Sequence, residues 1–178
     1  MVDACVETLI LGSFPSAASL AAGQYYAHSR NQFWPILAAV LAESLTDMPY
    51  AKRLVRLRAH AIGLWDVVGS CERTGSLDAA IRNSHGNDVE QLLRRLPRLR
   101  RVLFNGQAAG RAAGRFHAAG LVTAVLPSSS PALATLRLDA KIALWQLALQ
   151  GRCKPADARK NPLDLESGAI RVQKGVMP

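Results

Sequence analysis

The residues best suited to chemistry are concentrated between Leu9 and Trp34. The segment begins as an apolar run typical of a buried strand and breaks at Gly12 into a loop rich in Gly, Pro and Ser. Two tyrosines, a histidine and an asparagine follow within seven residues: Tyr25, Tyr26, His28 and Asn31. A strand that enters such a loop brings polar groups to the carboxyl edge of a sheet, where open α/β folds bind ligands. Aromatic faces with amide and imidazole edges suit a flat heterocycle such as a nucleobase.

The elements that position these residues can be predicted from hydrophobic periodicity. Continuous apolar runs that end near Gly or Asn predict strands at 6–12, 61–67, 101–104 and 121–126. Apolar residues at a spacing of about 3.6 predict helices at 33–43, 50–60, 87–95, 107–119 and 134–150. Asn87 is the expected N-cap of the third of these helices, with Glu90 completing a capping box.

This alternation of strands and helices predicts an α/β fold. We expect a three-layer α/β/α sandwich around a four-stranded parallel central sheet. Right-handed crossovers then bring the loops 13–32, 66–76, 105–107 and 127–133 to one edge of the sheet. The folded domain is expected to span residues 1–150, and residues 151–178 are expected to form a mobile basic tail.

Composition narrows the partners of the protein. The chain has 178 residues and a formal net charge of +9, which favours a polyanion, most simply nucleic acid. No apolar run reaches membrane-spanning length, and the acidic first seven residues argue against a secretory leader. We therefore expect a cytoplasmic, nucleoid-associated monomer that makes no membrane contact.

Several classes of site are disfavoured by the motifs. The three cysteines are too widely spaced for a zinc or iron–sulfur site, so no metal is expected. Gly12 is followed neither by Gly-Lys-Ser/Thr nor by GxGxxG, which disfavours nucleoside triphosphate and dinucleotide binding. No serine lies in a GxSxG context. We expect no organic cofactor.

The motifs of four loops, taken together, resemble one family. The chain contains LGSFPS, AGxYYxHxxNxFW, LWDVxxxCxRxGSLDxxI, FNG and LPSxSPA in that order, within residues 11–132. These motifs resemble those of the uracil-DNA glycosylase superfamily, and most of all its hypoxanthine-DNA glycosylase branch. The resemblance implies a cofactor-free enzyme that flips a deaminated base, hypoxanthine first, out of DNA and hydrolyses its N-glycosidic bond.

The resemblance implies a catalytic role for Asn31. Many superfamily members hold the attacking water with an Asp or Asn two residues after the glycine of the first loop, where this chain has Phe14. Phe14 is therefore expected to contact the base, and Asn31 of the NxFW motif to orient the water. An amide can aim water but is too weakly basic to take its proton. The competing interpretation, that Asn31 caps the following helix, is compatible with this role.

Three further residues are candidates for contact with the base. Tyr26 corresponds to the aromatic residue that stacks on the flipped base in relatives, and a core aromatic is the alternative. Tyr25 and Tyr26 cannot both face a pocket if the segment is extended. Asp66 can accept a hydrogen bond from a ring N–H, as in hypoxanthine and uracil, or can order its own loop. Asn105 is a candidate for the pocket floor or a plain Asn-Gly turn.

The remaining candidates are DNA contacts. The Ser/Pro loop resembles the segment with which relatives pinch the DNA backbone, and an ordinary loop is the alternative. Leu133 stands where the branch often has an amide, and could act as an apolar wedge. The full set of expected DNA contacts is His28, Arg73, Ser128, Ser129, Ser130, Pro131 and Leu133.

Other functions remain open at this point. One is a uracil- or mismatch-preferring DNA glycosylase of the same fold. Another is a non-catalytic module that binds lesions in DNA. A third is a hydrolase of free nucleosides, although the basic charge and the Ser/Pro loop argue against it.

Overall fold

The computed structural model describes residues 1–72, 82–133, 135–151 and 172–173. Its main sheet has the strand order β2-β1-β5-β6-β7. The first four strands are mutually parallel and confirm the expected central sheet; they are β1 (Thr8–Gly12), β2 (Ile62–Asp66), β5 (Arg101–Asn105) and β6 (Val122–Leu126). The two-residue β7 (Val172–Gln173) joins β6 in antiparallel orientation and lies within the segment expected to be a tail.

The central strands are apolar on both faces because helices cover both sides of the sheet. Alternate side chains of a strand point to opposite faces. Ile10 of β1 therefore packs into one hydrophobic core with Leu64, and Leu9 and Leu11 pack into a second core with Phe104. This arrangement explains the unbroken apolar runs seen in the sequence.

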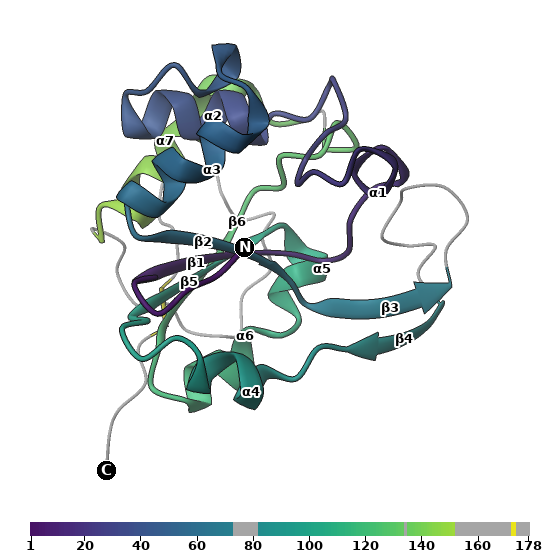
Figure 1. Ribbon diagram of the computed structural model, residues 1–178, viewed down its shortest axis with the longest axis vertical. Helices are drawn as coiled ribbons and strands as arrows, with labels where there is room; N and C mark the ends of the chain where they lie inside the picture. Colours follow the sequence, from purple (N-terminus) through teal and green to yellow (C-terminus); the bar gives the residue numbers. More distant parts are fainter. Residues whose placement is uncertain (73–81, 134, 152–171, 174–178) are drawn as a thin grey trace.

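The helices form the two outer layers of the predicted sandwich (Figure 1). Helices α2 (Phe33–Leu41), α3 (Tyr50–Ala59) and α7 (Leu138–Leu149) cover the face of Ile10, together with the 3₁₀ turn η1 (Leu45–Asp47). Helices α4 (Val89–Arg94), α5 (Gln107–Gly110) and α6 (Ala113–Ala118) cover the other face. The three-layer α/β/α architecture is thus confirmed.

The prediction of an unbroken loop over 13–32 is wrong, because this segment contains helix α1 (Ala17–Ala22). Its boundaries have ordinary signals. The Ser16 hydroxyl accepts a hydrogen bond from the Ser19 N–H at the first turn, and Gly23 ends the helix in the left-handed conformation with φ of 59°. The helix is short and stands at the carboxyl edge of the sheet.

The loop expected after Asp66 is instead an antiparallel ribbon. Strands β3 (Val68–Glu72) and β4 (Arg82–Gly86) pair with each other and extend beyond the main sheet (Figure 1). Their sequences lack the clean apolar alternation that marks a strand, which is why periodicity did not reveal them. Arg73 lies outside the described residues.

Three helix boundaries also differ from expectation. Asp88, rather than Asn87, caps α4 by accepting a hydrogen bond from the Gln91 N–H. The expected helix over 107–119 is divided into α5 and α6, in a segment whose Gly110 and Gly114 lower helix propensity. Helix α7 begins at Leu138 instead of 134.

No helix in the described ranges is long and apolar enough to span a membrane.

Candidate active site

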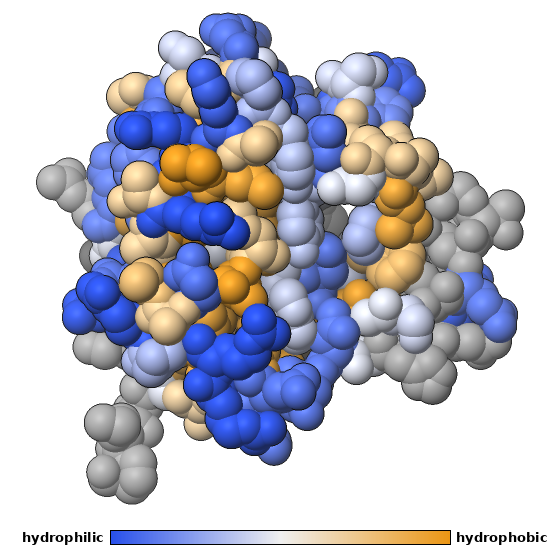
Figure 2. Space-filling model, viewed as in Figure 1, coloured by the Kyte–Doolittle hydropathy of each residue, from blue (hydrophilic) through white to orange (hydrophobic). Residues whose placement is uncertain are grey.

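A cavity of about 300 Å³ opens at the carboxyl edge of the sheet. In the sheet, β2 lies on one side of β1 and β5 lies on the other. The strand order therefore reverses direction at β1. Such a switch point leaves a crevice beyond the strand ends. Residues of β1, β2, β5, α1, α3 and the loop after β6 line the cavity. Figure 2 shows the surface hollowed beside α1.

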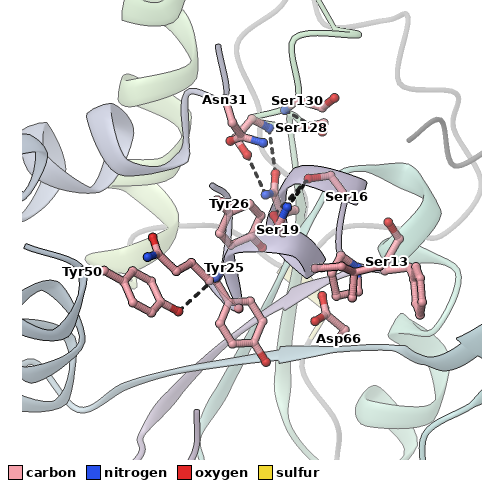
Figure 3. A pocket seen from close by; sticks show the side chains of 18 residues that line it. Ser13, Ser16, Ser19, Tyr25, Tyr26, Asn31, Tyr50, Asp66, Ser128 and Ser130 are labelled. Atoms are coloured by element: carbon pink, nitrogen blue, oxygen red, sulfur yellow. Dashed lines mark hydrogen bonds between the residues drawn. The ribbon is translucent and has the colours of Figure 1, made fainter. Parts of the chain in front are cut away.

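Most of the predicted site residues lie together in this cavity. The lining includes eight of them: Phe14, Tyr26, Asn31, Asp66, Asn105, Ser128, Ser129 and Ser130. His28, Pro131 and Leu133 are not among the lining residues. In Figure 3, Asn31 and the serines of the last loop lie at one end, Asp66 lies at the other, and Tyr26 lies between them.

The side chain of Asn31 is held by the start of α2. Its Oδ1 accepts a hydrogen bond from the Phe33 N–H at 3.0 Å, and the backbone N–H of Asn31 donates to the His28 carbonyl at 2.8 Å. The N-cap of α2 is Gln32, so the interpretation that Asn31 caps the helix is wrong, although Asn31 does pair with the first N–H of α2. Asn31 lines the cavity at the same time. The hydrogen bond from Phe33 fixes the orientation of the Asn31 amide. The Nδ2 of Asn31 makes no hydrogen bond to another described residue.

Tyr26 already has an aromatic partner on one face. Its ring stacks on Phe33 with centroids 3.7 Å apart and planes inclined by 18°. Because Phe33 is fully buried in the core, this stack fixes the plane of the phenol ring. A flat ligand in the cavity would meet an aromatic surface whose orientation is set in advance.

The condition under which only one of the two adjacent tyrosines could face the pocket, an extended backbone, is not met. Tyr26 has φ of 56°, so the backbone is left-handed rather than extended, and both Tyr25 and Tyr26 line the cavity. The Tyr50 hydroxyl accepts a hydrogen bond from the Tyr25 N–H at 2.9 Å. Tyr50 also lines the cavity, and only its place at the start of a predicted helix marked it in the sequence.

Asp66 and Tyr26 approach each other over Gly12. A Cβ at position 12 would lie 2.5 Å from Asp66 Oδ1 and 3.3 Å from the Tyr26 hydroxyl, so a larger residue there would force the Asp66 side chain to move. Burial raises the pKa of Asp66 to about 6, against the opposing charge of the Met1 α-ammonium group. The deep end of the cavity thus presents a carboxyl that ionises close to neutral pH.

Asn105 uses both ends of its amide on Ser129. Its Nδ2 donates to Ser129 Oγ and its Oδ1 accepts from the Ser129 N–H, both at 2.8 Å. Ser129 is fully buried, whereas Ser128 and Ser130 are half-buried. Asn105 therefore holds the last loop against the end of β5, with one amide hydrogen left for a ligand.

The serines on either side of Ser129 shape the loop. Ser128 Oγ accepts from the Ser130 N–H at 3.1 Å, and Ser130 Oγ accepts from the Ala132 N–H at 3.3 Å. Both hydroxyl hydrogens stay available as donors, because a hydroxyl can accept and donate together. His28 shapes the segment before α2 in a similar way, since its Nδ1 accepts a hydrogen bond from the Arg30 N–H.

The cavity therefore combines an oriented aromatic face, an acid at one end and a neutral amide at the other. No lysine, arginine or histidine is among its described lining residues. Within the described ranges, no three His, Cys, Asp or Glu side chains cluster as metal ligands would. The arrangement suits a flat, hydrogen-bonding ring whose attached group lies beside Asn31.

We predict that the Asp66 carboxyl is half-protonated at about pH 6. Since the fold raises this pKa, the stability that the group contributes is complete below the unfolded value of about 3.9. That contribution is lost as the pH rises through about 6. Asp66→Asn should therefore stabilise the protein more at pH 8 than at pH 5. Carboxyl ¹³C NMR titration and urea unfolding check both points, and a midpoint near 4 would contradict them.

We predict that Gly12→Ala displaces the Asp66 carboxylate, because the new methyl group would collide with it. The Asp66 pKa should fall toward its ordinary value as the displaced group gains solvent. Gly114→Ala in α6 is the matched control, because a Cβ there meets nothing within 4 Å. The same NMR titration measures both variants. An unchanged Asp66 pKa in folded Gly12→Ala would show that the two positions are not in contact.

Comparison with known proteins agrees with this geometry. Residues 2–148 match the family model described as the uracil DNA glycosylase superfamily. Two proteins named hypoxanthine DNA glycosylase are similar over 132 residues, 74% of this chain and 84% of each relative: one from Methanosarcina acetivorans, 42% identical, and one from Methanosarcina barkeri, 39% identical.

A solved structure shares the fold. It is a solution NMR structure from Methanosarcina acetivorans, assigned as a uracil DNA glycosylase, with a TM-score of 0.76 and 37% sequence identity. The match covers 84% of this chain and 92% of that protein. With the family model matching nearly the whole α/β/α domain around the cavity, this chain belongs to the uracil DNA glycosylase superfamily.

Proposed function

We propose that this protein is a monofunctional DNA glycosylase of base excision repair that removes deaminated bases, hypoxanthine first. The observation that carries the proposal is the presence of Asn31, Tyr26 and Asp66 in one cavity. The names of the two methanogen relatives support hypoxanthine as the first candidate substrate.

Recognition of the base would begin with stacking. The target nucleotide must leave the duplex to reach the cavity, and its base would lie against the phenol ring of Tyr26, beside Phe14. Asp66 would accept the N1–H of hypoxanthine at the deep end. An ionised carboxylate cannot donate, so a base with an acceptor at that position would be disfavoured.

Cleavage would take place at the other end of the cavity. The glycosidic bond breaks through an oxocarbenium-like state, and Asn31 would hold water beside the developing cation. The bond breaks with its electron pair leaving on the base, and the water oxygen bonds the sugar carbon. Because an amide is not an effective base, the water would give up its proton only after most of the bond is broken, and that proton would neutralise the departing base. A lyase step needs an amine nucleophile, and the described lining contains no lysine.

The DNA backbone would be held at the rim. Ser128 and Ser130 each have a hydroxyl hydrogen for a phosphate, and the net charge of +9 favours the polyanion. Pro131 is exposed next to them, and Leu133 follows as the candidate wedge. Arg73 and His28 remain proposed phosphate contacts.

A uracil-preferring enzyme is the second candidate. Uracil also presents a ring N–H, which Asp66 could accept, and the similar NMR structure is assigned as a uracil DNA glycosylase. Duplexes with a single inosine or a single uracil distinguish the two functions. We expect free base and an abasic site from inosine first. Lesion binding without abasic product would instead indicate a non-catalytic module.

We predict that Asn31→Ala slows single-turnover excision about 100-fold, because the water loses its orientation. The rate is measured on inosine-containing duplex with enzyme in excess. Asn31→Asp is the matched variant, since it keeps an oxygen to accept from the Phe33 N–H and to hold water. It should retain far more activity than Asn31→Ala. A folded Asn31→Ala protein with the full rate would remove Asn31 from the mechanism.

We predict that Tyr26→Ala weakens binding to lesion DNA by about 1–3 kcal/mol, the typical contribution of base stacking on an aromatic ring. Affinity for undamaged DNA should change little. Tyr26→Phe keeps the ring and should bind like the parent protein. Fluorescence anisotropy with matched duplexes measures the difference. An equal loss for both duplexes in Tyr26→Ala would argue against stacking on the flipped base.

A further inference from the structure

Lys141 in α7 is an unusual residue for a protein interior. It is 1% exposed, and burial lowers the pKa of its ammonium group. It forms no ion pair with a carboxylate of the described residues; its Nζ donates instead to Gln32 Oε1 at 2.8 Å and to the Leu133 carbonyl at 2.9 Å. A buried cation with only neutral acceptors is costly, so packing alone does not account for it.

The two acceptors of Lys141 belong to the two separate segments that form the reactive end of the cavity. Gln32 directly follows Asn31, and Leu133 ends the 127–133 loop that carries the serines. The same two segments meet again where the Gln32 N–H donates to the Ser129 carbonyl at 2.9 Å. The two hydrogen bonds of Lys141 thus form a second connection between these segments.

Helix α7 also holds the start of the 127–133 loop. Trp145, fully buried, lies four residues after Lys141 on the same side of the helix, and its Nε1 donates to the Pro127 carbonyl at 3.1 Å. One turn of α7 therefore fixes both ends of the loop. Both residues also reach the segment around Asn31: Trp145 packs edge-on against the Phe33 ring, with centroids 5.9 Å apart, and Lys141 hydrogen-bonds the Gln32 side chain.

We propose that Lys141 is a positioning residue that joins the Asn31 segment to the 127–133 loop, so that the loop on DNA and the water-holding amide take their places together. Lys141 touches neither the base nor the reacting atoms. The inference rests on the proposed glycosylase activity. An apolar side chain of similar length would fill the same space but would lack the two hydrogen bonds that link Gln32 to Leu133 through Lys141.

The test is a double-mutant cycle on single-turnover excision from inosine-containing duplex, with the folded fraction measured by circular dichroism. Lys141→Met and Gln32→Leu should each slow excision about 10- to 100-fold, the scale expected for a small misplacement of a catalytic group. The double variant should be no slower than the slower single variant, because both break one connection. Rate losses that multiply would overturn the proposal.

A conservative variant separates positioning from simple packing. Gln32→Glu keeps an acceptor for Lys141 and should retain excision close to that of the parent protein, whereas Gln32→Leu should not. If the Gln32 side chain only filled space, Gln32→Glu and Gln32→Leu would have the same excision rate. This pair also decides the question if Lys141→Met does not fold.

Arg115→Met is the matched charge control. Arg115 is exposed on α6, on the other face of the sheet, so its removal subtracts one positive charge without touching the loop. It should leave the single-turnover rate unchanged. Parent protein that produces no abasic site on any lesion would refute the glycosylase proposal itself, whereas active parent with a fully active, folded Lys141→Met protein would refute only the positioning role.

Discussion

The site depends on how Ser129 is held between two elements that are distant in the chain. Its N–H and Oγ bond the amide of Asn105 at the end of β5, and its carbonyl accepts from Gln32 at the start of α2. Ser129 is fully buried, so leaving any of these groups unpaired would be costly. This one residue brings the loop after β6 to the strand ends and to the neighbour of Asn31.

Under the proposed function, the cavity offers little negative charge beside the bond that is broken. The proposed water-holding group, Asn31, is an amide, and Phe14 stands where many superfamily members have an Asp or Asn. The carboxyl that is present, Asp66, lies at the far end of the cavity from Asn31 (Figure 3). If the proposed roles hold, this arrangement suits a base that departs readily without a strong general base.

Much of the fold and of the site could be predicted from the sequence, because parallel strands and loop motifs leave local signals. The four parallel strands and the gathering of Asn31, Asp66 and the serines at one edge were foreseeable. Other features depend on tertiary contacts. The left-handed turn at Tyr26 cannot be read from an extended pattern, and the ribbon of β3 and β4 lacks apolar alternation. Nothing local distinguishes Lys141 from a solvated lysine on a helix.

The close approach over Gly12 has a consequence for how this pocket can change over evolutionary time. Positions 12, 26 and 66 share one small volume, so the effect of a substitution at one depends on the residues at the other two. Substitutions within this triplet are therefore expected to act together rather than independently. Libraries that randomise the three positions together reach combinations that single-position libraries cannot sample.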